Sequence, residues 1–108
     1  MPPLLVDDIH YYNQGDLAYA LAAATSDHSE IEKYRRLLAV ILEGNERMAS
    51  ESRANLFYSM GKIDLLLNDK NRAKQDLQKA LDGDKSLILG KSKQDELVRD
   101  FLVSTGLN

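Results

Sequence analysis

The sequence contains no cysteine, and its two prolines are Pro2 and Pro3. Without cysteine the chain forms no disulfide, has no thiolate nucleophile and holds no cysteine-based zinc or iron–sulfur site. Without an internal proline, no helix is interrupted by a missing N–H donor. Residues that favour helices, such as alanine, leucine and lysine, are plentiful, and valine is scarce. The composition therefore predicts a single all-α domain over residues 1–108.

Long apolar runs and a concentration of one charge sign are also missing. The opening run of Leu4, Leu5 and Val6 is too short for a signal-peptide core, and no segment reaches the ~20 apolar residues of a membrane span. The net charge is −3, and the basic residues of the second half alternate with aspartates instead of forming a basic face. We therefore expect a soluble cytoplasmic protein that binds neither membranes nor nucleic acid.

The first half of the chain has the pattern of helical hairpins. A helical pattern over residues 6–24 contains Gly15. Because glycine inside a helix costs about 1 kcal/mol relative to alanine, we expect the helix to break there. Ser29 and Glu32 form a capping box that predicts the start of the next helix, and Gly44 predicts its end.

The second half is predicted to contain three helices and one connector. Asn45 is expected to cap a helix of roughly 22 residues that ends near Leu67, or two helices if Ser50 and Ser52 break it. A further helix is expected to end at Gly83. The short apolar segment 85–91 is interpreted as a connector packed against the core. A last helix over residues 92–104 is expected to cover the open end of the preceding pair.

Between Ala54 and Leu87, small and large apolar residues recur at the spacing of two closely packed antiparallel helices. These residues are Phe57, Met60, Gly61, Ala73, Leu77 and Ala80. In this register the stretch resembles a tetratricopeptide repeat (TPR), a helix-turn-helix unit of 34 residues. Asp64 and Lys85 depart from the family pattern, and the register 34 residues earlier does not fit a second repeat. The resemblance implies compact antiparallel hairpins of about five or six helices with a C-terminal capping helix.

The resemblance also implies a binding surface. In this family the first helices of successive repeats line a concave groove that holds a peptide or helix of a partner, and by position Asn55, Tyr58, Lys62 and Leu65 would face it. Tyr58 would supply apolar contact with a hydroxyl group, Lys62 would meet a carboxylate, and Asn55 would bond extended backbone. The alternative interpretation is that Tyr58 and Leu65 cover the core against the preceding helices.

A tyrosine cluster in the first half is a second candidate surface. It consists of Tyr11, Tyr12, Tyr19 and Tyr34. Tyr12 and Tyr19 are seven residues apart and can share one helix face. Because tyrosine is enriched at protein interfaces, we include these two among the candidate partner-binding residues. The alternative is that the cluster fills the first hairpin.

Motifs for catalysis and for metal binding are incomplete. Gly90-Lys91-Ser92 matches the end of a phosphate-binding loop, but Lys85 stands where its first glycine is required. We therefore expect a non-catalytic module without cofactor or metal that binds another protein, as an adaptor, chaperone or inhibitor. A self-associating helical domain that forms a homodimer is one alternative. A less favoured one is a small-molecule or metal-binding enzyme domain that uses His10 or His28 with nearby carboxylates.

Overall fold

The structure is a computed structural model that describes residues 3–107, with side chains described from residue 13 onward. Within these residues the chain forms six helices and no strand, and 81% of it is helical, so the predicted all-α class is confirmed. The helices are α1 (Pro3–Ala23), α2 (His28–Gly44), α3 (Ser50–Leu66), α4 (Lys70–Gly83), α5 (Lys85–Ser92) and α6 (Glu96–Thr105).

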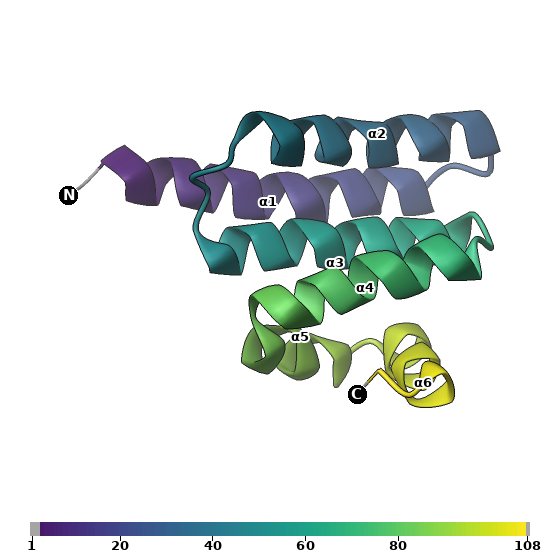
Figure 1. Ribbon diagram of the computed structural model, residues 1–108. Coiled ribbons are helices and arrows are strands. Elements are labelled where there is room, and N and C mark those ends of the chain that lie inside the picture. The colour runs from purple at the N-terminus through teal and green to yellow at the C-terminus, as the bar shows by residue number, and fades with distance from the viewer. Residues whose placement is uncertain (1–2, 108) are drawn as a thin grey trace.

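Helix α3 lies at the centre of the arrangement and packs against α1, α2, α4 and α5. Figure 1 shows α1 and α2 as an antiparallel pair at the top, α3 and α4 as a second pair below it, and α5 and α6 at the bottom. The described part of the chain measures about 40 × 30 × 22 Å. Every face of α3 therefore has a neighbour, which explains why so many of its residues are buried.

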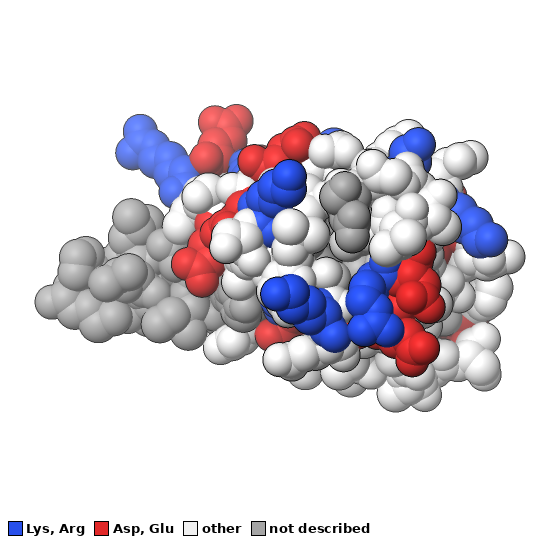
Figure 2. Space-filling model, turned by 90° about the horizontal axis from the view of Figure 1, so that it is seen from below, with Lys and Arg blue, Asp and Glu red and all other residues white. Residues whose placement is uncertain are grey.

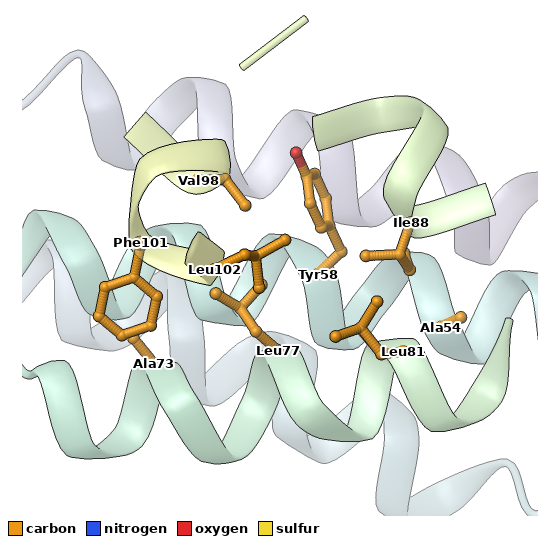
Figure 3. Close-up of a cluster of buried hydrophobic side chains, with 10 residues drawn as sticks. Ala54, Tyr58, Ala73, Leu77, Leu81, Ile88, Val98, Phe101 and Leu102 are labelled. Atoms are coloured by element: carbon orange, nitrogen blue, oxygen red, sulfur yellow. The ribbon is translucent and has the colours of Figure 1, made fainter. Parts of the chain in front are cut away.

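Two apolar clusters hold the helices together, one on each side of α3. The first joins α1 and α2 to α3 through residues such as Ala22, Leu38 and Ile63. The second joins α3 and α4 to α5 and α6, and Figure 3 shows its side chains. Phe57 of α3 packs against both clusters. Each buried leucine or isoleucine contributes about 1.5–3 kcal/mol, so α3 supplies the surface on which both halves of the fold depend.

Aspartate side chains start four of the helices. Asp27, Asp69, Asp84 and Asp95 each accept a hydrogen bond from a backbone N–H in the first turn of the helix that follows. The predicted capping box at Ser29 is therefore wrong, because Asp27 caps α2 two residues earlier. Asp84 has two roles, since its own N–H donates to Ala80 O at the end of α4. Helices α4 and α5 thus meet at a single residue.

The predicted break at Gly15 is wrong. Helix α1 continues through this residue, and Gly15 is buried against α3. A Cβ atom placed on Gly15 would lie 2.8 Å from Ser59 Oγ and 3.2 Å from Leu56 Cδ2. Glycine is therefore used here for close approach of two helices, and tertiary packing outweighs its low helix propensity.

Several other helix boundaries differ from the predictions. Residues 45–49 form a turn, so the third helix begins at Ser50 and has no side-chain cap. The expected connector 85–91 is helix α5, and the last helix begins at Glu96 instead of residue 92. The left-handed residue between α3 and α4 is Asn68, with φ 58°. The last helix is followed by Gly106, which has the left-handed φ of 72°.

The close packing expected between residues 54 and 87 is present. A Cβ atom on Gly61 would lie 2.6 Å from Leu77 Cγ, so only glycine lets α4 approach α3 at this point. Ala73 and Ala80 are fully buried on the facing side of α4. These small residues set the short distance between the two helices.

Candidate functional site

The predicted partner-binding residues of α3 do not line an open groove. Asn55 is 0% exposed and Tyr58 is 2% exposed, while Lys62 is partly buried. Leu65 is also partly buried and packs against the apolar cluster of α3, α4, α5 and α6. Of the two candidates on α1, Tyr12 has a side chain outside the described residues, and Tyr19 is described below. The face of α3 that was expected to be free is covered by α1, α5 and α6.

Polar side chains from four helices meet over this face of α3, and we call them the polar strip. The strip consists of Asp16 and Tyr19 of α1, Asn55 and Lys62 of α3, Lys91 of α5 and the α6 cap Asp95. At one end, Lys91 Nζ donates to Asn55 Oδ1 and lies 3.5 Å from Asp16 Oδ1. Asn55 Nδ2 in turn lies 3.4 Å from Asp16 Oδ1. This end therefore links α1, α3 and α5.

The other end of the polar strip is organised around Lys62. Its ammonium lies 3.2 Å from Asp95 Oδ2 and 3.7 Å from the centre of the Tyr19 ring. The second contact is a cation–π interaction. Burial raises the pKa of Tyr19, and the charge of Asp95 raises it further. Lys62 therefore joins α1, α3 and the start of α6.

Tyr58 lies at the base of the polar strip between the two lysines. The Lys62 ammonium is 5.5 Å from the centre of its ring and the Lys91 ammonium is 5.4 Å from it. The hydroxyl is buried and has no hydrogen-bond partner within the described residues. Burial raises the pKa of Tyr58, with Asp95 adding to the effect, so the phenol stays protonated at neutral pH. Figure 3 shows the hydroxyl directed away from α4, past α5 and α6.

The surroundings of the Tyr58 hydroxyl favour one kind of ligand, a hydrogen-bond acceptor with a negative charge. A buried hydroxyl without a partner costs about 1–3 kcal/mol, and an acceptor that reaches it recovers that cost. Two nearby positive charges favour an acceptor that is negatively charged. The strip also contains the two aspartates that pair with the lysines, so an arriving carboxylate would exchange with one of them.

Sequence reasoning found Asn55, Tyr58, Lys62 and Tyr19 but missed their partners Asp16, Lys91 and Asp95. Asp16 and Lys91 are 75 positions apart, and no periodic pattern connects such distant residues. Lys91 drew attention only through its phosphate-loop resemblance. In the structure Gly90, Lys91 and Ser92 all belong to helix α5, so they form no loop.

A second polar group, which we call the ion cluster, lies between α2, α3 and α4. Arg35 Nε donates to Asp64 Oδ1 at 2.6 Å, and its Nη2 donates to Asp76 Oδ2 at 2.8 Å. Arg72 Nη2 donates to Glu32 Oε1 at 2.6 Å, and its Nε lies 3.7 Å from Asp64 Oδ1. The hydrogen bond from Arg72 lowers the pKa of Glu32. The ion cluster therefore ties α2 to the α3–α4 pair.

Asp64 is the most unusual member of the ion cluster. Its side chain is 0% exposed, and its Oδ2 atom has no hydrogen-bond partner within the described residues. Burial raises its pKa to about 8, with Asp76 contributing in the same direction and Arg35 opposing it. Asp64 occupies the position where the TPR pattern has an aromatic residue, so here a buried carboxyl group takes the place of a ring.

A groove of about 350 Å³ lies beside the ion cluster, between α2, α3 and α4. Leu42, Phe57 and Met60 line it, with Arg53 and Lys79 also on its wall, and no histidine contributes. His28 is exposed at the start of α2, and the side chain of His10 lies outside the described residues. Among the described side chains, no three of histidine, aspartate or glutamate lie together in an arrangement that could hold a metal ion.

On the face that Figure 2 shows, positive and negative side chains are mixed, and neither sign forms a continuous patch. None of the helices in the described part is both long enough and apolar enough to cross a bilayer. Comparisons of the chain with protein families, with curated proteins and with solved structures returned no match.

Proposed function

We propose that this chain is a TPR-like, non-catalytic protein-interaction module that binds an acidic segment of a partner protein on the polar strip. An adaptor, a chaperone or an inhibitor would each work through such a surface. The arrangement of the helices supports the TPR-like part of the proposal. Helices α1, α3 and α5 are the first helices of three consecutive pairs, and α3 packs against both of the others. The polar strip extends across these three first helices.

The observation that carries the proposal is the buried hydroxyl of Tyr58. Within the described residues it has no hydrogen-bond partner, although the ammonium groups of Lys62 and Lys91 lie 5.5 Å and 5.4 Å from the centre of its ring. A carboxylate of the partner would accept from this hydroxyl and from one ammonium group. The bond from the hydroxyl satisfies a buried donor, and the bond from the ammonium group is charge-assisted. Both therefore favour the bound state.

The lysines that lie near the Tyr58 ring, and their ion-pair partners, are all partly exposed. The side chains of Lys62 and Lys91 are 19% and 24% exposed, and their partners Asp95 and Asp16 are 24% and 54% exposed. Partly exposed ion pairs contribute only about 0–1 kcal/mol. Exchange of Asp95 or Asp16 for a carboxylate of the partner therefore costs little, and the helices keep their positions.

The proposal is tested with an array of short synthetic peptides whose acidic content varies at constant length. We expect binding to increase with acidic content and to weaken as salt is added, because ammonium–carboxylate attraction is screened. A peptide that binds is then measured by fluorescence anisotropy against the double variant Lys62→Glu/Lys91→Glu. We expect the affinity of this variant to fall by at least about tenfold.

The matched control is Lys70→Glu/Lys74→Glu, which makes the same charge change at two exposed lysines of α4, a helix that contributes no residue to the polar strip. Its affinity is expected to stay within about threefold of the wild type, since distant exposed charges are screened. Circular dichroism shows whether each variant keeps its helices. Equal affinity of the strip variant and the wild type, with helicity retained, would overturn the assignment of the binding surface.

A further inference from the structure

Helix α2 carries apolar side chains on its outer face as well as on its inner face. Its inner residues Ile31, Leu38 and Leu42 are buried, but Leu37 is 47% exposed and Val40 is 59% exposed. The neighbouring helix α1 adds the exposed residues Leu17 and Leu21. Single exposed apolar residues need no explanation, but Leu37 and Val40 are three residues apart on one helix and share its outer face, which makes this face a candidate interaction surface.

The outer face of α2 has the spacing of a helix–helix contact. Lys33, Leu37, Val40 and Gly44 follow one another at intervals of four, three and four residues. This alternation places them in one stripe along the helix, as in the contact line of a coiled coil. Leu37 and Val40 form the centre of the stripe, and Gly44 at its end adds no side chain. A Cβ atom on Gly44 would have no neighbour within 4 Å, so this end is open.

Two opposite charges flank the stripe on the same side. Arg36 and Glu43 are seven residues apart, which is two helical turns, and both are exposed. Neither forms an ion pair with another described residue. They therefore stand at the two ends of one edge, with Leu37 and Val40 between them.

The stripe and its flanking charges are self-complementary: they match the same residues of a second α2 helix that lies antiparallel. A two-fold axis midway between Leu37 and Val40 places Leu37 of one copy opposite Val40 of the other. Arg36 then lies opposite position 41 of the second copy. Glu43 of that copy is two residues further along its helix, a shift of about 3 Å along the helix axis. In antiparallel helix pairs the equivalent edges face each other, so both Arg36–Glu43 pairs form by symmetry.

The ends of the stripe also match. The same axis places Lys33 of one copy opposite Gly44 of the other, at the C-terminal end of α2. The last turn of α2 contains no basic residue, and its one side-chain donor to a carbonyl among the hydrogen bonds described is the neutral Asn45, which donates to Ile41 O at 2.7 Å. A lysine from the second copy would supply a positive side chain and would also favour the negative end of the helix dipole.

From this geometry we propose that a second copy of the chain docks on the outer face of α2, giving a two-fold homodimer with antiparallel α2 helices. No residue of the polar strip belongs to α2, so the dimer keeps the proposed peptide-binding surface accessible on each copy. Because Leu37 and Val40 are the two large exposed apolar residues of α2, we expect a contact smaller than the interfaces of permanent dimers and a dimer that dissociates on dilution.

The test is the molar mass in solution, measured by sedimentation velocity and light scattering from about 1 µM to about 1 mM, a range that covers weak dimers. The wild type is expected to pass from monomer to dimer as the concentration rises. Leu37→Glu is expected to remain monomeric, whereas Leu97→Glu on α6, which changes a residue that is 58% exposed, is expected to dimerise like the wild type.

Charge reversal tests the antiparallel arrangement itself. Arg36→Glu alone and Glu43→Arg alone each place like charges opposite one another in the homodimer, and each is expected to weaken dimerisation by about tenfold or more. A mixture of the two single variants restores both pairs and is expected to form a heterodimer, and the double variant is expected to form a homodimer again.

Three outcomes would overturn the proposal. They are a wild type that stays monomeric at every concentration, a dimer that Leu37→Glu leaves intact, and single charge reversals that have no effect. Circular dichroism of each variant distinguishes loss of the interface from loss of the fold.

Discussion

Raising the pH from 5 to 7 is expected to destabilise the fold because the native state holds a proton on Asp64 that the unfolded chain releases. Asp64 is fully buried with one unpartnered oxygen, and its pKa rises from 3.8 to about 8. Between these two values the native state binds one more proton than the unfolded state. Stability from this group is therefore complete below about pH 4 and is lost as the pH rises through about 8.

The expected size of the effect follows from one proton. One pKa unit corresponds to about 1.4 kcal/mol, so the free energy of unfolding should fall by about 2–3 kcal/mol between pH 5 and pH 7. Urea titrations followed by circular dichroism at several pH values measure it. The variant Asp64→Asn carries a neutral side chain of the same shape, and we expect its free energy of unfolding to be nearly constant over the range.

The matched control is Asp82→Asn at an exposed position of α4, which should keep the pH dependence of the wild type. A wild type whose free energy of unfolding is the same at pH 5 and pH 7, or higher at pH 7, would refute the reasoning. It would mean that the guanidinium of Arg35 at 2.6 Å keeps Asp64 ionised in spite of its burial.

Three further substitutions test the packing and the buried polar groups, each by its free energy of unfolding in urea. Gly15→Ala should destabilise the fold by about 1 kcal/mol, because its Cβ would lie 2.8 Å from Ser59 Oγ, whereas Gly90→Ala in the open part of α5 should stabilise it by up to about 1 kcal/mol. Equal effects would refute the close approach at Gly15. Tyr58→Phe should stabilise the fold by about 1 kcal/mol because it removes an unpartnered buried hydroxyl, and it should weaken peptide binding. Loss of stability would show that the hydroxyl has a partner. Arg35→Met should cost about 1–3 kcal/mol at neutral pH, because it removes the hydrogen-bond donor shared by the buried carboxyl groups of Asp64 and Asp76. An unchanged stability would show that these groups do not need Arg35.

The sequence predicted local packing better than it predicted helix boundaries. The sequence predicts Gly61 and Ala73 as helix–helix contact points because small residues at these positions of the repeat pattern indicate close approach of two helices. Gly15 follows the same physics, yet without a repeat around it glycine also fits a break, and propensity favours the break by about 1 kcal/mol. The contact with Ser59, 44 positions away, decides between the two interpretations.

In the candidate site, too, contacts within one helix could be predicted from the sequence, whereas contacts between distant segments could not. Asn55, Tyr58 and Lys62 share one face of α3, and their spacing makes that predictable. What covers the face depends on α1 and α5, which reach it from 39 and 36 positions away. A polar contact between distant residues leaves no periodic signal, so the sequence could not reveal that Asn55 is buried. The burial of Tyr58 in the apolar cluster is one of the two interpretations that its sequence position allows.

The single-residue connection at Asp84 has a mechanical consequence. Because this aspartate ends α4 and starts α5, no flexible segment separates the two helices, and α4 in turn packs along α3. The ammonium groups of Lys62 and Lys91 are therefore carried on a stiff frame, and the distance between them does not depend on the fluctuations of a loop. A partner that binds there meets a preorganised surface and loses little conformational entropy in the receptor.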